Sequence, residues 1–376
     1  MAEKAKIAES KKPDNNLRAA LISLGSVSSR WTYEAMKRYF GHVDNLNIKK
    51  IQISFGSKVP QVLYEGKPIG PYDCIYSKGS FRYSDVLGAL RNILQDSAYM
   101  PISSRAFAVG HDKVLSQIEM QRLKVPMPVT YLTSSAKAAK EILEKINYPI
   151  IMKLPKGTQG KGVMVAESYA SASSMLDTLD ALRQPFLIQE YVDTDGEDIR
   201  AIVVGDKVIA SMKRVAQSNE ARANVHAGGS VQPIMLDTNT QKIAVAAAKA
   251  IGAEICGVDI LQSIKGPVVI EVNLSPGLQG VTKASNLDVA DKIASYLFKR
   301  TVSRQQESRS KSAKDLLENL ESEEKDQCFK EIITNLDMRN NKILLPELFT
   351  RITKFNEEEE VVVTIEKGMI VIKKLL

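Results

Sequence analysis

Two neighbouring apolar segments, ICGVDILQ and PVVIEVN, predict an antiparallel hairpin whose turn is centred near Lys265. Asp259 and Glu271 lie six residues on either side of that turn, so they should face each other across the strand pair. Asn273 follows Glu271 by two residues and therefore lies on the same face of its strand. The hairpin brings two carboxylates and an amide oxygen together inside strands built mainly from valine and isoleucine.

Two adjacent buried carboxylates repel each other and lose hydration, which is costly unless a cation neutralises them. Ligation by oxygen atoms alone suits Mg²⁺ or Mn²⁺, which usually share their coordination shell with substrate phosphates. In the alternative interpretation, one of the two acids faces solvent and pairs with a lysine. The spacing of Asp259 and Glu271 leaves both interpretations open.

A glycine-rich turn, GTQGKG, joins the predicted strands IIMKL and VMVAE. Its glycines, Gly157, Gly160 and Gly162, would let backbone N–H groups close over phosphate oxygens. The turn lacks the Gly-Lys-Ser/Thr of a Walker A motif. Such a turn is more often structural than a nucleotide lid. Lys153 in the preceding strand favours the nucleotide interpretation, because a buried lysine without a counter-charge is energetically costly.

Further polar side chains follow apolar strands in the middle of the chain. The strand FLIQEYV ends in Glu190, which could offer a carboxylate to an adenine ring. Arginines occur in the next predicted strands and in the predicted loop RANVHAGG. Arginine side chains can stabilise the charge that builds during phosphoryl transfer. Each of these residues alone is more commonly a strand end or a surface ion-pair partner.

In this order, the residues resemble the RimK-type glutamate ligases of the ATP-grasp family. The resemblance covers about residues 17–300, and its stretches are HDK (111–113), IIMKLPKGTQGKGV (150–163), IQEYV (188–192), EDIRAIVVGDKVIASMKR (197–214), RANVHAGG (222–229), GVDIL (257–261) and VIEVNLSPGLQG (269–280). It implies an α/β (α+β) chain with the ATP-grasp fold. The implied parts are a polar, disordered tail (1–16), an N-terminal α/β pre-ATP-grasp domain (17–105) and an ATP-grasp domain (106–300), the last divided into a lid subdomain (about 112–190) and a metal-binding subdomain (about 191–300).

The resemblance also implies roles for individual residues. ATP would be bound by Lys113, Lys153, Gly157, Gly160, Gly162, Glu190, Tyr191, Val192, Asp198, Arg222, Ala223 and Asn224. Within this set the two lysines would contact the phosphates, with residues 157–162 as the mobile lid, and Glu190 and Val192 would hold the adenine and Asp198 the ribose. Two Mg²⁺ ions, with Mn²⁺ as a substitute, would be bound by Asp259, Glu271 and Asn273. The implied catalytic residues are Arg214, Arg222 and Asn224.

The reaction implied by the resemblance is the ADP-forming ligation of a carboxylate to an amine. A substrate carboxylate attacks the γ-phosphate of ATP to form an acylphosphate. An amino acid, which is usually L-glutamate in this family, then displaces phosphate to form an amide. The acceptor is expected on a protein, a peptide or a cofactor, and an amino-group carrier protein is an alternative. The loops Ser26–Trp31 and Ser77–Tyr83 are where we would look for acceptor selection.

The end of the chain differs in character. Residues 301–328 change from basic to acidic and predict a charged linker or exposed helix. Residues 329–376 resemble an AbrB-like swapped-hairpin domain, which implies a homo-oligomer, a dimer or a tetramer. Four glutamates, 357–360, would oppose a phosphate backbone and favour dimerisation over DNA binding. The alternative is a DNA-binding regulator whose ATP-grasp body senses nucleotide.

Composition excludes several other classes of protein. The cysteines, Cys74, Cys256 and Cys328, are scattered and odd in number, so no disulfide scaffold or CxxC metal site is expected. No apolar stretch approaches the roughly 18 residues of a membrane helix, and the charged N-terminus lacks the apolar core of a signal peptide. We therefore expect a cytoplasmic protein without membrane partners. The net charge of +7 fits an anionic substrate such as ATP at least as well as nucleic acid.

Overall fold

The computed structural model describes residues 16–56, 58–133, 135–155, 162–215, 230–322, 337–339, 342–345, 347–356 and 359–374. The chain divides into two compact units, Met1–Arg304 and Gln305–Leu376. The finer domain limits expected from the sequence remain predictions. None of the described helices is both long enough and apolar enough to cross a membrane.

A parallel three-stranded sheet opens the first unit, in the order β2 (His42–Asn47), β1 (Arg18–Ser23), β6 (Cys74–Ser77). The sequence predicts a helix from Thr32 to Phe40. Helix α1 (Val27–Met36) instead begins at Val27, because the side chain of Ser26 caps it by accepting a hydrogen bond from the N–H of Ser29. The remaining elements of this region are η1 (Ile48–Lys50), β3 (Ile51–Ser54), β4 (Gln61–Tyr64), β5 (Lys67–Pro68), η2 (Phe81–Tyr83), α2 (Ser84–Leu94), α3 (Ser104–Val109) and α4 (Lys113–Arg122).

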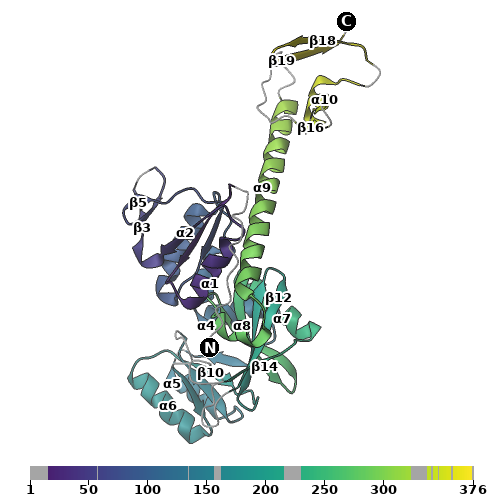
Figure 1. Ribbon diagram of the computed structural model, residues 1–376. Coiled ribbons are helices and arrows are strands. Elements are labelled where there is room, and N and C mark those ends of the chain that lie inside the picture. The colour runs from purple at the N-terminus through teal and green to yellow at the C-terminus, as the bar shows by residue number, and fades with distance from the viewer. Residues whose placement is uncertain are drawn as a thin grey trace, which may run out of the picture. The chain divides into compact units, whose positions relative to one another are not determined.

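A second sheet, the lid sheet, is antiparallel and has a small core of its own. Its order is β7 (Thr130–Leu132), β10 (Leu187–Glu190), β8 (Ile150–Lys153), β9 (Val163–Ala166). Helices α5 (Ala136–Leu143) and α6 (Tyr169–Ala181) lie together against it (Figure 1). Ile150 and Met152 of β8 enter that core. Strand alternation therefore turns Lys153 to the opposite face.

The large sheet contains the hairpin of ICGVDILQ and PVVIEVN that the sequence predicts. It is antiparallel, in the order β13 (Ser230–Pro233), β12 (Lys207–Val215), β11 (Glu197–Val204), β14 (Ile255–Ser263), β15 (Gly266–Asn273). Asp259 is the register partner of Glu271, as the position of the turn predicts. Helices α7 (Thr238–Ile251) and α8 (Gln279–Ser285) also belong to this region.

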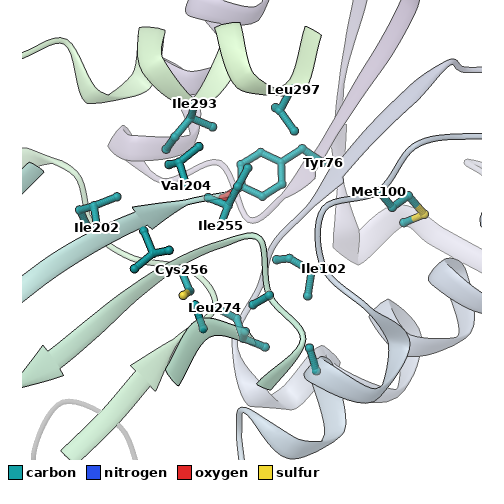
Figure 2. Packing of buried hydrophobic residues seen from close by; sticks show 14 of the residues in the cluster. Tyr76, Met100, Ile102, Ile202, Val204, Ile255, Cys256, Leu274, Ile293 and Leu297 are labelled. Carbon is teal, nitrogen blue, oxygen red and sulfur yellow. The ribbon is translucent and has the colours of Figure 1, made fainter. Parts of the chain in front are cut away.

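One continuous apolar core joins the parallel sheet to the large sheet. Figure 2 shows the fully buried ring of Tyr76, from β6, close to Ile293 and Leu297 of helix α9 (Val289–Ser322) and to Ile255 of β14. The lid sheet keeps a separate core. The parallel sheet and the large sheet are thus packed as one body, and the loops at their shared edge are held in fixed positions.

The second unit begins within α9 and contains short elements. These are β16 (Asp337–Arg339), β17 (Lys342–Leu344), α10 (Glu347–Thr353), β18 (Val361–Glu366) and β19 (Met369–Lys374). Strands β18 and β19 form an antiparallel hairpin that turns at Gly368, which has a φ of 82°. The β-rich character expected for this region is present, and the AbrB-like interpretation stays a prediction.

Candidate active site

Four charged side chains on one face of the large sheet form the acid–arginine cluster, which consists of Asp198, Arg200, Arg214 and Asp259. Arg200 and Asp259 are register partners on β11 and β14. Arg200 donates from Nε and Nη2 to the two carboxylate oxygens of Asp259 at 2.7 and 2.6 Å. Two parallel hydrogen bonds of this kind fix both the position and the plane of the carboxylate.

Arg214, on β12, completes the acid–arginine cluster. It donates from Nε and Nη2 to Asp198 at 2.5 and 2.7 Å, and its Nη2 lies 3.1 Å from Oδ2 of Asp259. Burial would raise the pKa of Asp259, but Arg200 and Arg214 outweigh it and lower that pKa to about 2. Asp259 is therefore held ionised although only 5 % of its surface is exposed.

Glu271 faces Asp259, but the cations near Glu271 do not outweigh the effects that raise its pKa. Burial raises its pKa, the negative charge of Asp259 raises it further, and Lys113, Arg200 and Lys153 oppose both effects. The Asn273 amide fits beside it in the orientation that satisfies both neighbours: its oxygen accepts from Nη2 of Arg200 at 3.0 Å, and its nitrogen donates to Oε1 of Glu271 at 3.0 Å. Glu271 itself is exposed on β15, so one of the two facing acids is accessible to solvent.

The residues expected to bind metal suit a hard divalent cation. Asp259 and Glu271 are opposite each other, Asn273 adds an amide oxygen, and carboxylate oxygens keep lone pairs beyond those that the arginines use. Within the described ranges, no three His, Cys, Asp or Glu side chains are grouped so as to hold a metal. Further oxygen ligands would then come from substrate phosphates or water, as is usual for Mg²⁺.

Two lysines face this carboxylate pair from outside the large sheet. Nζ of Lys153 donates to Oε1 of Gln189 at 2.8 Å, and burial lowers the pKa of Lys153 to about 8. Lys113 is the first residue of α4, and its N–H donates to the carbonyl of Pro155 at the end of the β8 region at 3.3 Å. Burial lowers the pKa of Lys113, while Glu271 raises it. Both cations thus lie within electrostatic reach of Glu271, as expected for phosphate-binding lysines.

A cleft of about 420 Å³ opens beside these residues. Lys113, Glu271 and Asn273 line one part of it. Another part is lined by residues that follow β1 and β6, which are Leu24, Ser26, Ser29, Lys78, Gly79, Ser80 and Phe81. Residues of both segments that the sequence suggests for acceptor selection, Ser26–Trp31 and Ser77–Tyr83, therefore line the same cleft as the candidate metal ligands Glu271 and Asn273.

The remaining predicted site residues that the structure describes do not line this cleft. Glu190 is exposed at the end of β10, where its Oε2 accepts from the N–H of Val129 at 3.3 Å, and Tyr191 and Val192 follow it half-buried. Asp198, expected at the ribose, has both carboxylate oxygens bonded to Arg214. Gly162 closes the β8–β9 turn with a φ of 78°. Five predicted residues lie outside the described residues: Gly157, Gly160, Arg222, Ala223 and Asn224.

Sequence reasoning missed Lys78 as a cleft residue. It directly follows the last residue of β6, the apolar strand CIYS, and only 5 % of its surface is exposed. A polar residue at the carboxyl end of a parallel strand is a recognised signal for a ligand-binding position. That signal was available in the sequence for Lys78.

Comparisons with known proteins identify the family of the chain. A family described as the RimK-like ATP-grasp domain matches residues 110–297. The "Probable alpha-L-glutamate ligase" of Thioalkalivibrio sulfidiphilus is 37 % identical over 273 residues, which cover 72 % of this chain and 91 % of that protein. The protein of the same name from Pseudoalteromonas translucida is 35 % identical over 280 residues, 74 % of this chain and 93 % of that one.

Solved structures show the same fold at lower identity. The ATP-grasp ligase PsnB, complexed with a minimal precursor, Mg and ADP, is 18 % identical and superimposes with a TM-score of 0.59, covering 76 % of this chain and 99 % of that one. The RimK domain ATP-grasp protein from Sphaerobacter thermophilus is also 18 % identical, with a TM-score of 0.58 and coverage of 74 % and 98 %.

Proposed function

Because this chain belongs to the RimK-like ATP-grasp family, we propose that it is an ATP-dependent, ADP-forming ligase that joins a carboxylate to the amino group of L-glutamate. The observation that carries the proposal is the convergence of Asp259, Glu271 and Asn273 with two lysines, Lys113 and Lys153, whose pKa values are lowered by burial. The names of the relatives support glutamate as the amino acid.

ATP binding is the first task of these residues. Lys153 and Lys113 reach the site from two different elements, β8 and α4, and are poised to hold the phosphates from opposite ends. The charged form of each lysine is destabilised by burial, which lowers the pKa of each. A bound polyphosphate would supply the missing counter-charge, so part of its binding free energy comes from relieving this cost.

Asp259, Glu271 and Asn273 would hold Mg²⁺, and two ions with Mn²⁺ as a substitute form part of the proposal. When bound, the metal would neutralise the charge on the phosphates during transfer. The acid–arginine cluster prepares this site, since Arg200 fixes the Asp259 carboxylate and Arg214 fixes Asp198 behind it. The protein thereby supplies position and charge before the substrates arrive.

The chemistry then needs alignment more than a covalent enzyme group. The acceptor carboxylate attacks the γ-phosphate, ADP leaves, and the amine of glutamate displaces phosphate from the acylphosphate. Water must be kept from the acylphosphate, a task that we assign to the turn between β8 and β9. Arg214, together with Arg222 and Asn224 farther along the chain, would stabilise the transferring phosphoryl group.

For the rest of the chain we propose the domain plan predicted from the sequence. The last 48 residues, 329–376, would form an AbrB-like domain that pairs two chains. The exposed apolar side chains of the hairpin β18–β19, which include Val362, Val363 and Ile365, support a role in association.

The test is Mg·ATP-dependent phosphate release with each of the twenty amino acids, with and without cell extract as the source of acceptor. The proposal predicts release stimulated by glutamate, and a matching mass shift would identify the acceptor. Stimulation by another amino acid would keep the mechanism and correct the substrate. No release under any condition, in a protein that still binds ATP, would contradict a ligase. The Glu271→Gln variant is the background control.

A further inference from the structure

Lys78 is a buried cation in the part of the cleft that residues of the parallel-sheet region line. It lines the cleft, although only 5 % of its surface is exposed. The backbone holds it firmly: its N–H donates to the carbonyl of Ile22 at 2.9 Å, which ties it to the carboxyl end of β1. The position of this cation is therefore built into the parallel sheet.

Lys78 has no counter-charge within the part of the chain that the structure describes. Its nearest interaction there is with the ring of Tyr76, whose centroid lies 5.7 Å from Nζ. Burial alone lowers the pKa of Lys78 to about 8, without a compensating acidic neighbour. Lysines are almost never fully buried unless they are paired, so this one calls for an anionic ligand.

The groups around Lys78 suit an anion. Three residues with hydroxyl groups, Ser26, Ser29 and Ser80, line the same cleft. The Oγ atoms of Ser26 and Ser29 are 3.0 Å apart. These two serines form the first turn of α1, a helix of ten residues, whose N-terminus carries partial positive charge. A buried ammonium group, hydroxyl donors and a helix N-terminus thus meet in one place.

This anion position is fixed relative to the catalytic sheet. Oγ of Ser275, which follows β15, donates to the carbonyl of Gly79 at 3.0 Å. The N–H of Leu278 donates to Oγ of Ser28 at 2.8 Å. Both bonds join the N-terminal loops to the segment directly after Asn273. A group held by Lys78 would therefore keep a set distance from the candidate phosphoryl-transfer centre.

We propose that Lys78, with Ser26 and Ser29, forms a subsite that binds a carboxylate group of a substrate. This inference rests on the proposed ligase function. The phosphates of ATP already have Lys113 and Lys153 beside the metal ligands, and the other anions of the reaction are the carboxylates of the amino acid and of the acceptor. Lys78 is thus a substrate-positioning and specificity residue.

The experiment measures dissociation constants by isothermal titration calorimetry at pH 7 in the presence of Mg²⁺ and a non-hydrolysable ATP analogue. The probes are L-glutamate and the dipeptide L-glutamyl-L-glutamate, the latter standing in for an acidic acceptor. The variants are Lys78→Met, which removes the charge and keeps the stem, and Lys78→Arg, which keeps a charge. Lys37→Met, at an exposed lysine outside the cleft lining, is the matched control.

We expect Lys78→Met to raise the dissociation constant of at least one probe tenfold or more, while Lys78→Arg and Lys37→Met change it less than threefold. The probe that weakens identifies the amino acid or the acceptor as the source of the carboxylate. Equal dissociation constants in the wild type and Lys78→Met would overturn the proposal, as would absence of binding of both probes to the wild type.

Two controls keep the outcomes distinct. Affinity for the ATP analogue reports that each variant is folded, and Lys78→Gln replaces Lys78→Met if the methionine variant loses nucleotide binding. A protein that binds carboxylates through Lys78 but releases no phosphate with glutamate would contradict the proposed function and leave this subsite standing.

Discussion

The acid–arginine cluster and Lys78 are buried charged regions of the same unit that are organised in opposite ways. In the cluster, Arg200 and Arg214 pair with Asp259 and Asp198 through short bidentate contacts. Lys78 has no acidic partner among the described residues, and the ring centroid of Tyr76 lies 5.7 Å from its Nζ. Folding itself neutralises the cluster, whereas Lys78 would be neutralised by a ligand.

This difference separates charge that is already paired within the fold from charge that has no partner there. Removing one member of a buried ion pair leaves an uncompensated charge and is strongly destabilising. Removing a buried charge that has no partner relieves a cost instead. Variants of the two regions should therefore change stability in opposite directions, and the following predictions are ordered by the size of that effect.

The largest effect is expected for Asp259→Ala. Arg200 and Arg214 are 16 % and 7 % exposed in their side chains, and both would lose a carboxylate partner. We expect the free energy of unfolding to fall by about 3–5 kcal/mol, the usual cost of breaking a buried pair. Urea denaturation measures this change. A loss smaller than about 1 kcal/mol would show that the cluster is better hydrated than the structure indicates.

Lys78→Met should have the opposite sign. The pKa of Lys78 is lowered from 10.5 to about 8, so the folded protein binds fewer protons than the unfolded chain between these two pH values. Wild-type stability should therefore rise relative to the variant as pH rises from 8 to 10.5. At pH 7 the variant should be more stable by up to about 3 kcal/mol, since one pKa unit corresponds to about 1.4 kcal/mol. Denaturation at pH 7 and pH 10 tests the sign, and a less stable variant at pH 7 would contradict the account.

A smaller effect is expected for nucleotide affinity as a function of pH. The pKa of Lys153 is about 8 because burial lowers it, so the free protein loses this phosphate-binding charge as pH rises through 8. ATP affinity should fall between pH 7 and pH 9, by up to about tenfold per unit for one titrating group. Lys153→Arg stays charged and should show a shallower dependence. Parallel pH profiles for the two proteins would remove Lys153 from the ATP site.

The smallest effect is expected where charge is exposed. Lys50 and Glu65 form an ion pair at 2.5 Å, with half of each side chain accessible to solvent. Solvent screens such a pair, and many exposed pairs contribute nothing measurable. Glu65→Gln should leave the melting temperature unchanged within error. A clear loss here would mean that stability differences in this protein do not separate buried from exposed charge.

The sequence was sufficient for the hairpin and its acids. The period of two along each strand, with the turn near Lys265, placed Glu271 opposite Asp259, and the structure confirms that register. The pairing of Arg200 with Asp259 was not predictable, because it depends on β11 lying beside β14, 59 residues away along the chain. Local spacing contains no information about which distant strands become neighbours.

Lys78 illustrates the same limit. The sequence shows a lysine after an apolar strand, but its burial depends on the loop after β15, where Ser275 bonds to Gly79 across 196 residues. The start of α1 was missed for a local reason. Val27-Ser28-Ser29 has weak helix propensity, and only the capping contact from Ser26 shows that the helix begins there.

The most direct test of the contrast between paired and ligand-dependent charge is the melting temperature of wild type and Glu271→Gln, with and without Mg²⁺ and the non-hydrolysable ATP analogue. Desolvation and the charge of Asp259 raise the pKa of Glu271, so its ionisation costs more in the folded protein than in the unfolded chain. We predict that the ligand-free variant melts at the same temperature as wild type or higher, and that it loses the increase that Mg²⁺ and nucleotide give the wild type. A variant that melts lower without ligands and keeps the full increase would contradict the account.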